Sequence, residues 1–184
     1  MEGMNQDNLF DAAALLKRAG VQEGMTVADC GVGRTAAVTL AAAQLVGERG
    51  VVYACDVVRS VLDVVKAKVE LAHAGNVRLV WTDLEVYRAA KQIIDESVDV
   101  VVLADTLSQS QRRAAMLHEC ARMVKPGGTL LVVEWKPDQT VLGPKVEHRL
   151  YTEELKPIAE LNRLEILEEF EAGEYHWGAL LHKR

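Results

Sequence analysis

The stretch from Met25 to Ala37 reads MTVADCGVGRTAA, and it decides the fold of this chain. An apolar run leads into Asp29, then into Gly31 and Gly33, and a segment of small residues follows at once. This order predicts a buried strand, a tight glycine turn and a helix that begins near Arg34. Because glycine has no Cβ, the turn can approach a ligand closely, and the free N–H groups of the helix start face the same space. Such a turn suits a nucleotide-like cofactor, and it also suits a plain strand-to-helix loop.

Composition indicates the class of protein. The chain has 184 residues, 49% of them apolar and 26% charged, which suits one globular core and predicts a single domain over residues 1–184. No apolar run reaches the roughly 20 residues of a membrane helix, so we expect no membrane partner. The net charge of −6 disfavours a nucleic-acid partner, because phosphate contacts need clustered Lys and Arg. Residues 1–7 lack the basic and apolar regions of a signal peptide, and we expect a cytoplasmic protein.

The cysteines argue against a metal site. Cys30, Cys55 and Cys120 are odd in number and scattered, and they form neither a CxxC motif nor a zinc-like spacing with histidine. We therefore expect reduced, structural thiols and no bound metal.

Strand-like and helix-like patterns alternate along the chain. Alternation at this spacing requires an α/β fold with a doubly wound, mostly parallel sheet, whose ligands lie at the carboxyl ends of the strands. The last two strands are separated by a short polar turn, which predicts an antiparallel hairpin at the sheet edge. The predicted strands are 25–28, 51–55, 77–81, 98–103, 129–133, 164–170 and 175–182, and the predicted helices are 8–20, 35–46, 59–74, 86–94, 111–124 and one from about 152.

Four carboxylates follow four predicted parallel strands, at Asp29, Asp56, Asp83 and Asp105. In a doubly wound sheet these positions share one edge, so the side chains can accept hydrogen bonds from an amine, a ribose diol and an adenine amino group. Helix capping is the alternative role for Asp83, and simple solvation is the alternative for Asp105.

Several motifs together resemble the class I S-adenosylmethionine-dependent methyltransferases, in particular the ubiquinone/menaquinone-biosynthesis type. Their order and spacing agree with that family over nearly the whole chain. The motifs are GMTVADCGVG at 24–33, GVVYACD at 50–56, KPGG at 125–128, VVEWK at 132–136, EHRL at 147–150 and EYHWG at 174–178.

The resemblance implies a Rossmann-like sheet of strand order 3-2-1-4-5-7-6, S-adenosylmethionine as the cofactor and a small-molecule methyl acceptor. It also implies a set of cofactor-binding residues. These are Asp29, Gly31 and Gly33 for the methionine part, Asp56 for the ribose with Val57 beside it, Asp83 and Leu84 for the adenine, and Asp105 facing the methionine or the substrate.

The residues that would bind the methyl acceptor are less clear from the sequence. Methyl transfer from a sulfonium is an in-line displacement, which positioning in a dry site can accelerate, and the sequence shows no clear general base. Catalytic residues are therefore left unassigned. His148, Tyr151, Tyr175 and His176 are candidates to line the acceptor pocket, although an ordinary partly exposed role suits each of them as well.

Two departures from the family pattern leave alternatives open. Thr35 stands where a third glycine is usual, which predicts a stiffer turn and a narrower cofactor pocket, and Ser108 stands where the family pattern has histidine. Both would suit a catalytically degenerate protein that binds S-adenosylmethionine or S-adenosylhomocysteine.

Two further enzyme classes share the fold. Residues 31–36 fit the G-x-G-x-x-A pattern of nicotinamide dinucleotide oxidoreductases, with Asp56 twenty residues beyond. Asp105 and Lys136 could serve as an acid/base pair in an RNA methyltransferase. The chain has no substrate domain for the first class and an acidic balance against the second, and the oligomeric state is left open.

Overall fold

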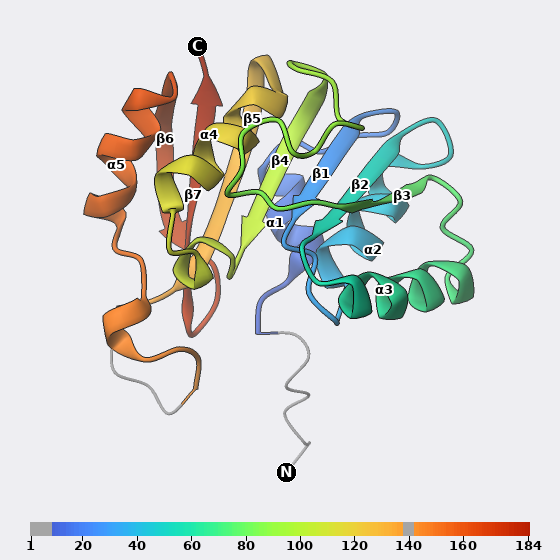
Figure 1. Cartoon of the computed structure of the whole chain (residues 1–184), viewed down its shortest axis with the longest axis horizontal. Helices are drawn as coiled ribbons and strands as arrows, with labels where there is room; N and C mark the ends of the chain where they lie inside the picture. The colour runs from blue at the N-terminus through green and yellow to red at the C-terminus, as the bar shows by residue number, and fades with distance from the viewer. Residues whose placement is uncertain (1–8, 138–141) are drawn as a thin grey trace.

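A seven-stranded sheet forms the middle layer of the computed structural model, which describes residues 9–137 and 142–184 (Figure 1). Its strand order is β3-β2-β1-β4-β5-β7-β6. The first five strands are parallel, and β7 runs antiparallel to both β5 and β6. The predicted fold class and strand order are thus confirmed. The strands are β1 (Thr26–Cys30), β2 (Val51–Asp56), β3 (Val77–Trp81), β4 (Val98–Ala104), β5 (Val124–Trp135), β6 (Leu164–Glu171) and β7 (His176–Lys183).

Helices cover both faces of the sheet (Figure 1). Side chains of α1, α2 and α3 join one buried cluster, and those of α4 and α5 join the other. Strand β5 shows why the parallel strands read as continuous apolar runs: Leu130 and Val132 pack into the α4/α5 cluster, while Leu131 and Val133 pack into the other. The helices are α1 (Ala12–Arg18), α2 (Ala37–Val46), α3 (Arg59–Leu71), α4 (Arg113–Met123) and α5 (Thr152–Leu161), with short 3-10 turns η1 (Leu107–Gln109) and η2 (Val146–His148).

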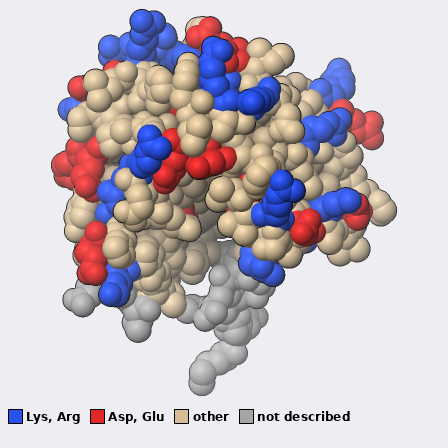
Figure 2. Space-filling view, in the orientation of Figure 1, with Lys and Arg blue, Asp and Glu red and all other residues tan. Residues whose placement is uncertain are grey.

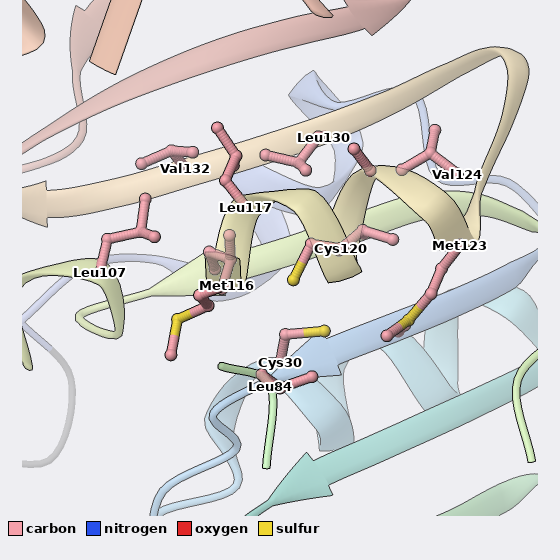
Figure 3. Close-up of a cluster of buried hydrophobic side chains, with 14 of the residues drawn as sticks. Cys30, Leu84, Leu107, Met116, Leu117, Cys120, Met123, Val124, Leu130 and Val132 are labelled. Carbon is pink, nitrogen blue, oxygen red and sulfur yellow. The ribbon is translucent and has the colours of Figure 1, made fainter. Parts of the chain in front are cut away.

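The three cysteines lie in the α4/α5 cluster. Cys30 and Cys55 are opposite each other in the β1–β2 register, and Cys120 projects from α4. All three are free and fully buried, and Figure 3 shows Cys30 and Cys120 in the layer between α4 and the sheet. This placement fits a structural role. Within the described residues, no group of three or more His, Cys, Asp or Glu side chains could hold a metal ion.

The predicted helix at 86–94 is wrong. This segment is a series of turns, and several of its backbone polar groups bond to two buried side chains of α4. Glu119 accepts the N–H groups of Arg88 (2.7 Å) and Ala90 (3.2 Å), and Arg122 donates to the carbonyl oxygen of Ile93 (2.9 Å). Side chains of another element thus take the place of helical hydrogen bonds. The helix-like spacing of apolar residues at 86–94 therefore does not lead to a helix.

The first two helices begin later than predicted. Helix α1 starts at Ala12, where Asp11 Oδ1 accepts the N–H of Ala14 at 3.0 Å, so Asp11 is the N-cap. The predicted start of this helix at residue 8 lies outside the described residues. Helix α2 starts at Ala37 and not near Arg34, because Ala36 has a left-handed φ of 55° that keeps the turn open for one residue more.

The carboxyl-terminal half follows the predicted order, including the edge hairpin of β6 and β7. Strand β5 is longer than predicted and takes in the KPGG segment, where Gly127 has the positive φ (78°) that a type II turn requires. In the part of the chain that the structure describes, no helix has the length and apolar character to cross a membrane. A single domain over residues 1–184 stays a prediction.

Candidate functional site

A hollow of about 490 Å³ opens at the carboxyl ends of β1, β2, β3 and β4. Six residues predicted to bind the cofactor line it, and two, Asp29 and Asp105, do not. Its walls are Gly31, Gly33 and Arg34 after β1, Asp56, Val57 and Val58 at the end of β2, Thr82, Asp83, Leu84 and Glu85 after β3, and Thr106, Gln109 and Ser110 after β4, with Val61 of α3 and Met116 of α4.

The glycine turn is shaped by its neighbours. Gly31 has φ +90°, and a Cβ at this position would stand 2.4 Å from Thr106 Oγ1, so only glycine fits. Its N–H donates to the carbonyl oxygen of Cys55 at 2.9 Å, which ties the turn to β2. Gly33, with φ +61°, has no atom within 4 Å of an added Cβ and therefore faces open space in the hollow.

Asp56 ends β2, as predicted, and its carboxylate is held by two backbone amides. Oδ1 accepts the N–H of Val58 at 2.8 Å, and Oδ2 accepts the N–H of Gly33 at 3.3 Å. The half-buried side chain keeps further acceptor capacity toward the hollow, because an ionised carboxylate has about four lone-pair sites.

The loop after β3 supplies polar and apolar groups side by side. Exposed Asp83 accepts the N–H of Glu85 on Oδ1 at 2.9 Å, while buried Leu84 forms an apolar part of the wall. Thr82 Oγ1 is buried and has no hydrogen-bond partner among the described residues. A buried polar atom on the wall of a hollow indicates a ligand or solvent that satisfies it.

No motif in the sequence predicts the link between Glu85 and Ser110. Ser110 Oγ donates to Glu85 Oε1 at 2.7 Å, and the N–H of Gln111 donates to the same oxygen at 3.2 Å. The hydroxyl bond, with help from the backbone amides, holds the pKa of Glu85 below its usual range. The position of Glu85 directly after Asp83 and Leu84 was a signal that it lies at the site. Its partner Ser110 lies on another loop, and only the fold brings the two residues close.

Asp29 lies beneath the turn and not on the wall. Its side chain is 1% exposed and accepts the hydroxyl of Thr39 at 2.6 Å, because the pleat of β1 directs it toward α2. Burial raises its pKa to about 7. The expectation that Asp29 shares one open edge with the other carboxylates is therefore wrong, and its part in cofactor binding stays a prediction.

Asp105 also faces away from the hollow. It follows β4 directly, and its Oδ1 lies 3.0 Å from Nε2 of His176, the first residue of β7. The ring of His176 is fully buried and lies against Phe10 and Trp135.

The other acceptor-side candidates do not gather at one place. The ring of Tyr175 lies 6.4 Å from that of Trp135, on the same side as His176. His148 and Tyr151 are exposed near the start of α5, and the N–H of Tyr151 donates to Glu154 as part of a helix cap. The structure thus brings together only Tyr175 and His176 of the four.

The two departures from the family pattern have different consequences. Thr35 is exposed and does not line the hollow, so the expected narrowing of the pocket is wrong. Ser108 is buried, and its N–H donates to Glu134 Oε1 at 3.1 Å. Glu134 is itself fully buried near the end of β5, and burial raises its pKa to about 7.

The model of the methyltransferase domain family matches residues 28–132, more than half of the chain and all four loops around the hollow. The chain belongs to this methyltransferase domain family.

Similar proteins agree with this membership. A ubiquinone/menaquinone biosynthesis C-methyltransferase UbiE from Azotobacter vinelandii is 36% identical over 130 residues, which are 70% of this chain and 49% of that protein. The UbiE of Shewanella sp. (strain ANA-3) is 34% identical over 140 residues, covering 76% of this chain and 53% of that protein. The chain thus spans about half the length of these curated relatives.

A solved structure extends the similarity over more of the chain. The crystal structure of a SAM dependent methyltransferase from Aquifex aeolicus matches with a TM-score of 0.83 at 30% identity, covering 94% of this chain and 89% of that one. Together with the family match, it agrees with the predicted class of enzyme, a methyltransferase.

Surface charge on the face shown in Figure 2 is mixed. Lys and Arg side chains alternate there with Asp and Glu and form no continuous basic patch. A phosphate-binding footprint needs such a patch, so this face gives no support to a nucleic-acid partner.

Proposed function

We propose that this protein binds S-adenosylmethionine in the hollow at the carboxyl ends of β1 to β4 and transfers the methyl group to a small-molecule acceptor. Asp56 carries the proposal: its carboxylate is fixed by two amides on the wall of the hollow, with lone pairs left for a ligand diol. When bound, the cofactor supplies a methyl group on a cationic sulfonium, which a nucleophile displaces in line.

The residues present fit such a ligand. A volume of about 490 Å³ lies within the usual range of ligand sites. Asp56 would accept hydrogen bonds from the two ribose hydroxyls, Leu84 and Met116 offer apolar walls to a purine ring, and the unpartnered Thr82 Oγ1 offers a polar contact beside them. Gly33 leaves open space where a side chain would intrude.

The acceptor is proposed to be small. The curated relatives are named C-methyltransferases, which supports a carbon nucleophile as the first acceptor atom to test. The charge of −6 and the mixed surface of Figure 2 support a small molecule over RNA.

Calorimetric titration with S-adenosylmethionine, S-adenosylhomocysteine and NAD tests the cofactor. We expect binding of the first two only, and Asp56→Ala should weaken it by about tenfold to several hundredfold, since two charge-assisted hydrogen bonds are lost. Asp63→Ala is the matched control, because Asp63 is an exposed carboxylate of α3 that does not line the hollow. A folded protein that binds neither sulfonium nor thioether at millimolar concentration would contradict the proposal, and so would equal effects of the two variants.

Transfer is tested by following a radiolabelled methyl group into low-mass products with a panel of carbon, nitrogen, oxygen and sulfur nucleophiles. A labelled small-molecule product supports the proposal. Tight binding of the cofactor with no transfer to any member would favour a binding protein without catalysis.

A further inference from the structure

An apolar stripe runs along the outer face of α3. Val64, Ala67 and Leu71 follow one another at helical spacing, and Leu71 is 83% exposed. Together they line a shallow hollow on the surface. The buried residues of the same helix, Leu62 and Val65, lie on the opposite side, against the sheet. The stripe is therefore outside the core, and none of its residues lines the hollow at the carboxyl ends of β1 to β4.

Charged side chains alternate in sign along one flank of this stripe. In chain order they are positive, negative, positive and negative, at Arg59, Asp63, Lys66 and Glu70. Their spacing of three and four residues places them one above the other on the helix, and Figure 2 shows the alternation over α3. In the described part of the chain, Arg59 and Asp63 have no ion-pair partner, and Lys66 reaches only Glu70 of its own helix, at 4.0 Å.

Two further contacts border the stripe. On its other flank, Lys68 Nζ donates to the carbonyl oxygen of Thr35 at 3.1 Å, so this charge is already bonded within the chain. At the amino end of the stripe, the guanidinium of Arg59 lies 3.8 Å from the ring centre of Trp81, which is 55% exposed on the edge strand β3. Tryptophan and arginine are enriched at protein interfaces. The stripe therefore begins at a pair of side chains that suits an interface.

The stripe is complementary to a second copy of itself. When two α3 helices pack antiparallel about a two-fold axis, each flank faces the same flank of the partner in reverse order. Placing Val64 of each copy opposite Ala67 of the other closes the stripe on itself. Leu71 then lies beside the start of the other α3, where Arg59 stacks on Trp81. One contact thus removes the apolar residues of both copies from water.

The charges match in the same arrangement. The order positive, negative, positive, negative meets its own reverse, so Lys66 of each copy comes beside Asp63 of the other, and Arg59 comes beside Glu70. A partner of a single charge sign would match only half of this flank. Charge complementarity therefore favours a second copy over an acidic or a basic protein.

We propose that the outer face of α3 joins two copies of this chain, packed antiparallel about a two-fold axis. The inference goes beyond the proposed function and does not depend on it. One pair of 13-residue helices is a smaller contact than the roughly 800 Å² per partner of a standard interface. We therefore expect a reversible dimer with a Kd of about 10–100 µM.

Sedimentation velocity of the full chain, at concentrations from about 1 µM to about 1 mM, tests the dimer. Leu71→Glu should raise the Kd at least about tenfold, because two apolar contacts per dimer are lost and two charges enter the stripe. Leu161→Glu is the matched control, because Leu161 is also 83% exposed but lies on α5. A wild-type protein that is monomeric at every concentration overturns the inference, and so do equal effects of the two variants.

Charge reversal tests the antiparallel arrangement. Asp63→Lys sets two lysines side by side in the contact, and Lys66→Asp sets two aspartates there, so each variant alone should be mainly monomeric. An equal mixture of the two should dimerise about as strongly as the wild type, because each new charge then meets its opposite on the other chain. A mixture that associates as weakly as the separate variants overturns the inference.

The fold of each variant is checked by far-UV circular dichroism, which should not change because all the substituted side chains are exposed. The wild-type concentration series is decisive without any variant. Raising the salt to about 0.5 M should weaken the wild-type dimer, because the proposed ion pairs lie at the surface. A dimer that is equally strong in high salt and in the mixed and separate variants would show that copies meet through another face.

Discussion

Gly31 and Thr106 touch so closely that a Cβ on residue 31 would stand 2.4 Å from Thr106 Oγ1. The same hydroxyl donates to the carbonyl oxygen of Cys30 at 3.0 Å, so it also holds the end of β1. The loops after β1 and β4, two walls of the hollow, are therefore joined at this contact. The width of the proposed cofactor site therefore depends on Gly31, because a side chain at this position would push Thr106 and its loop away.

Gly31→Ala should damage both stability and cofactor binding. A Cβ at φ +90° is strained, and it would push Thr106 away from Cys30. We expect a loss of about 2 kcal/mol or more in the free energy of unfolding, measured in urea, and a more than tenfold loss of S-adenosylhomocysteine affinity. Gly33→Ala is the matched control for the loss of stability, because its positive φ carries strain but no atom lies within 4 Å of the added Cβ. Equal losses in the free energy of unfolding would show that the contact with Thr106 is unimportant.

Glu134 should make stability depend on pH. Burial raises its pKa from 4.5 to about 7, so the folded protein holds a proton that the unfolded chain has lost. The stabilisation is fully present below about pH 4.5 and is lost as the pH rises through about 7. Between pH 5 and 8, wild-type protein should lose up to about 3 kcal/mol more than Glu134→Gln in urea unfolding.

Asp29 needs its own control in that experiment, because burial raises its pKa to about 7 as well. Asp29→Asn should remove a separate part of the same pH dependence, and the double variant should be flatter than either single one. If Glu134→Gln keeps the full wild-type slope, Glu134 is not protonated in the folded protein.

The buried pair of Glu119 and Arg122 should be required for the turns at 86–94. Glu119 is fully buried and accepts from the backbone of Arg88 and Ala90 as well as from Arg122. Glu119→Ala would leave two amides without an acceptor and remove one of the two carboxylates that pair with Arg122, at a cost of about 3–5 kcal/mol in the free energy of unfolding. Hydrogen exchange should show lost protection at Arg88 and Ala90.

The exposed ion pair of Glu23 and Arg49 is the control for Glu119→Ala. Glu23→Ala breaks the exposed contact with Arg49 and should leave the urea midpoint unchanged within error. An equally small effect of Glu119→Ala would mean that these turns are held by other contacts.

Thr35→Gly should leave cofactor affinity within about threefold of wild type, because Thr35 is exposed and does not line the hollow. Greater freedom of the unfolded chain should lower stability by up to about 1 kcal/mol. Calorimetry and urea unfolding measure the two effects. A marked gain in affinity would show that the threonine crowds the ligand after all.

The sequence by itself determined the layered fold, and through the family resemblance its strand order and six residues on the wall of the hollow. The layered fold and the places of Asp56 and Asp83 depend on local signals: apolar runs that end at these residues, and glycines where the backbone must turn sharply. Such signals are carried by neighbouring residues, so they can be read along the chain.

Only the tertiary structure decided where individual side chains point and which distant groups meet. The pleat of β1 turns Asp29 toward Thr39 and away from the hollow, although its place at a strand end matches that of Asp56. Glu119 replaces a helix at 86–94 with side-chain hydrogen bonds, and packing against Trp135 sets His176 behind Asp105. Each of these contacts joins separate elements, and because its free energy depends on burial and alignment created by the whole fold, no local pattern encodes it.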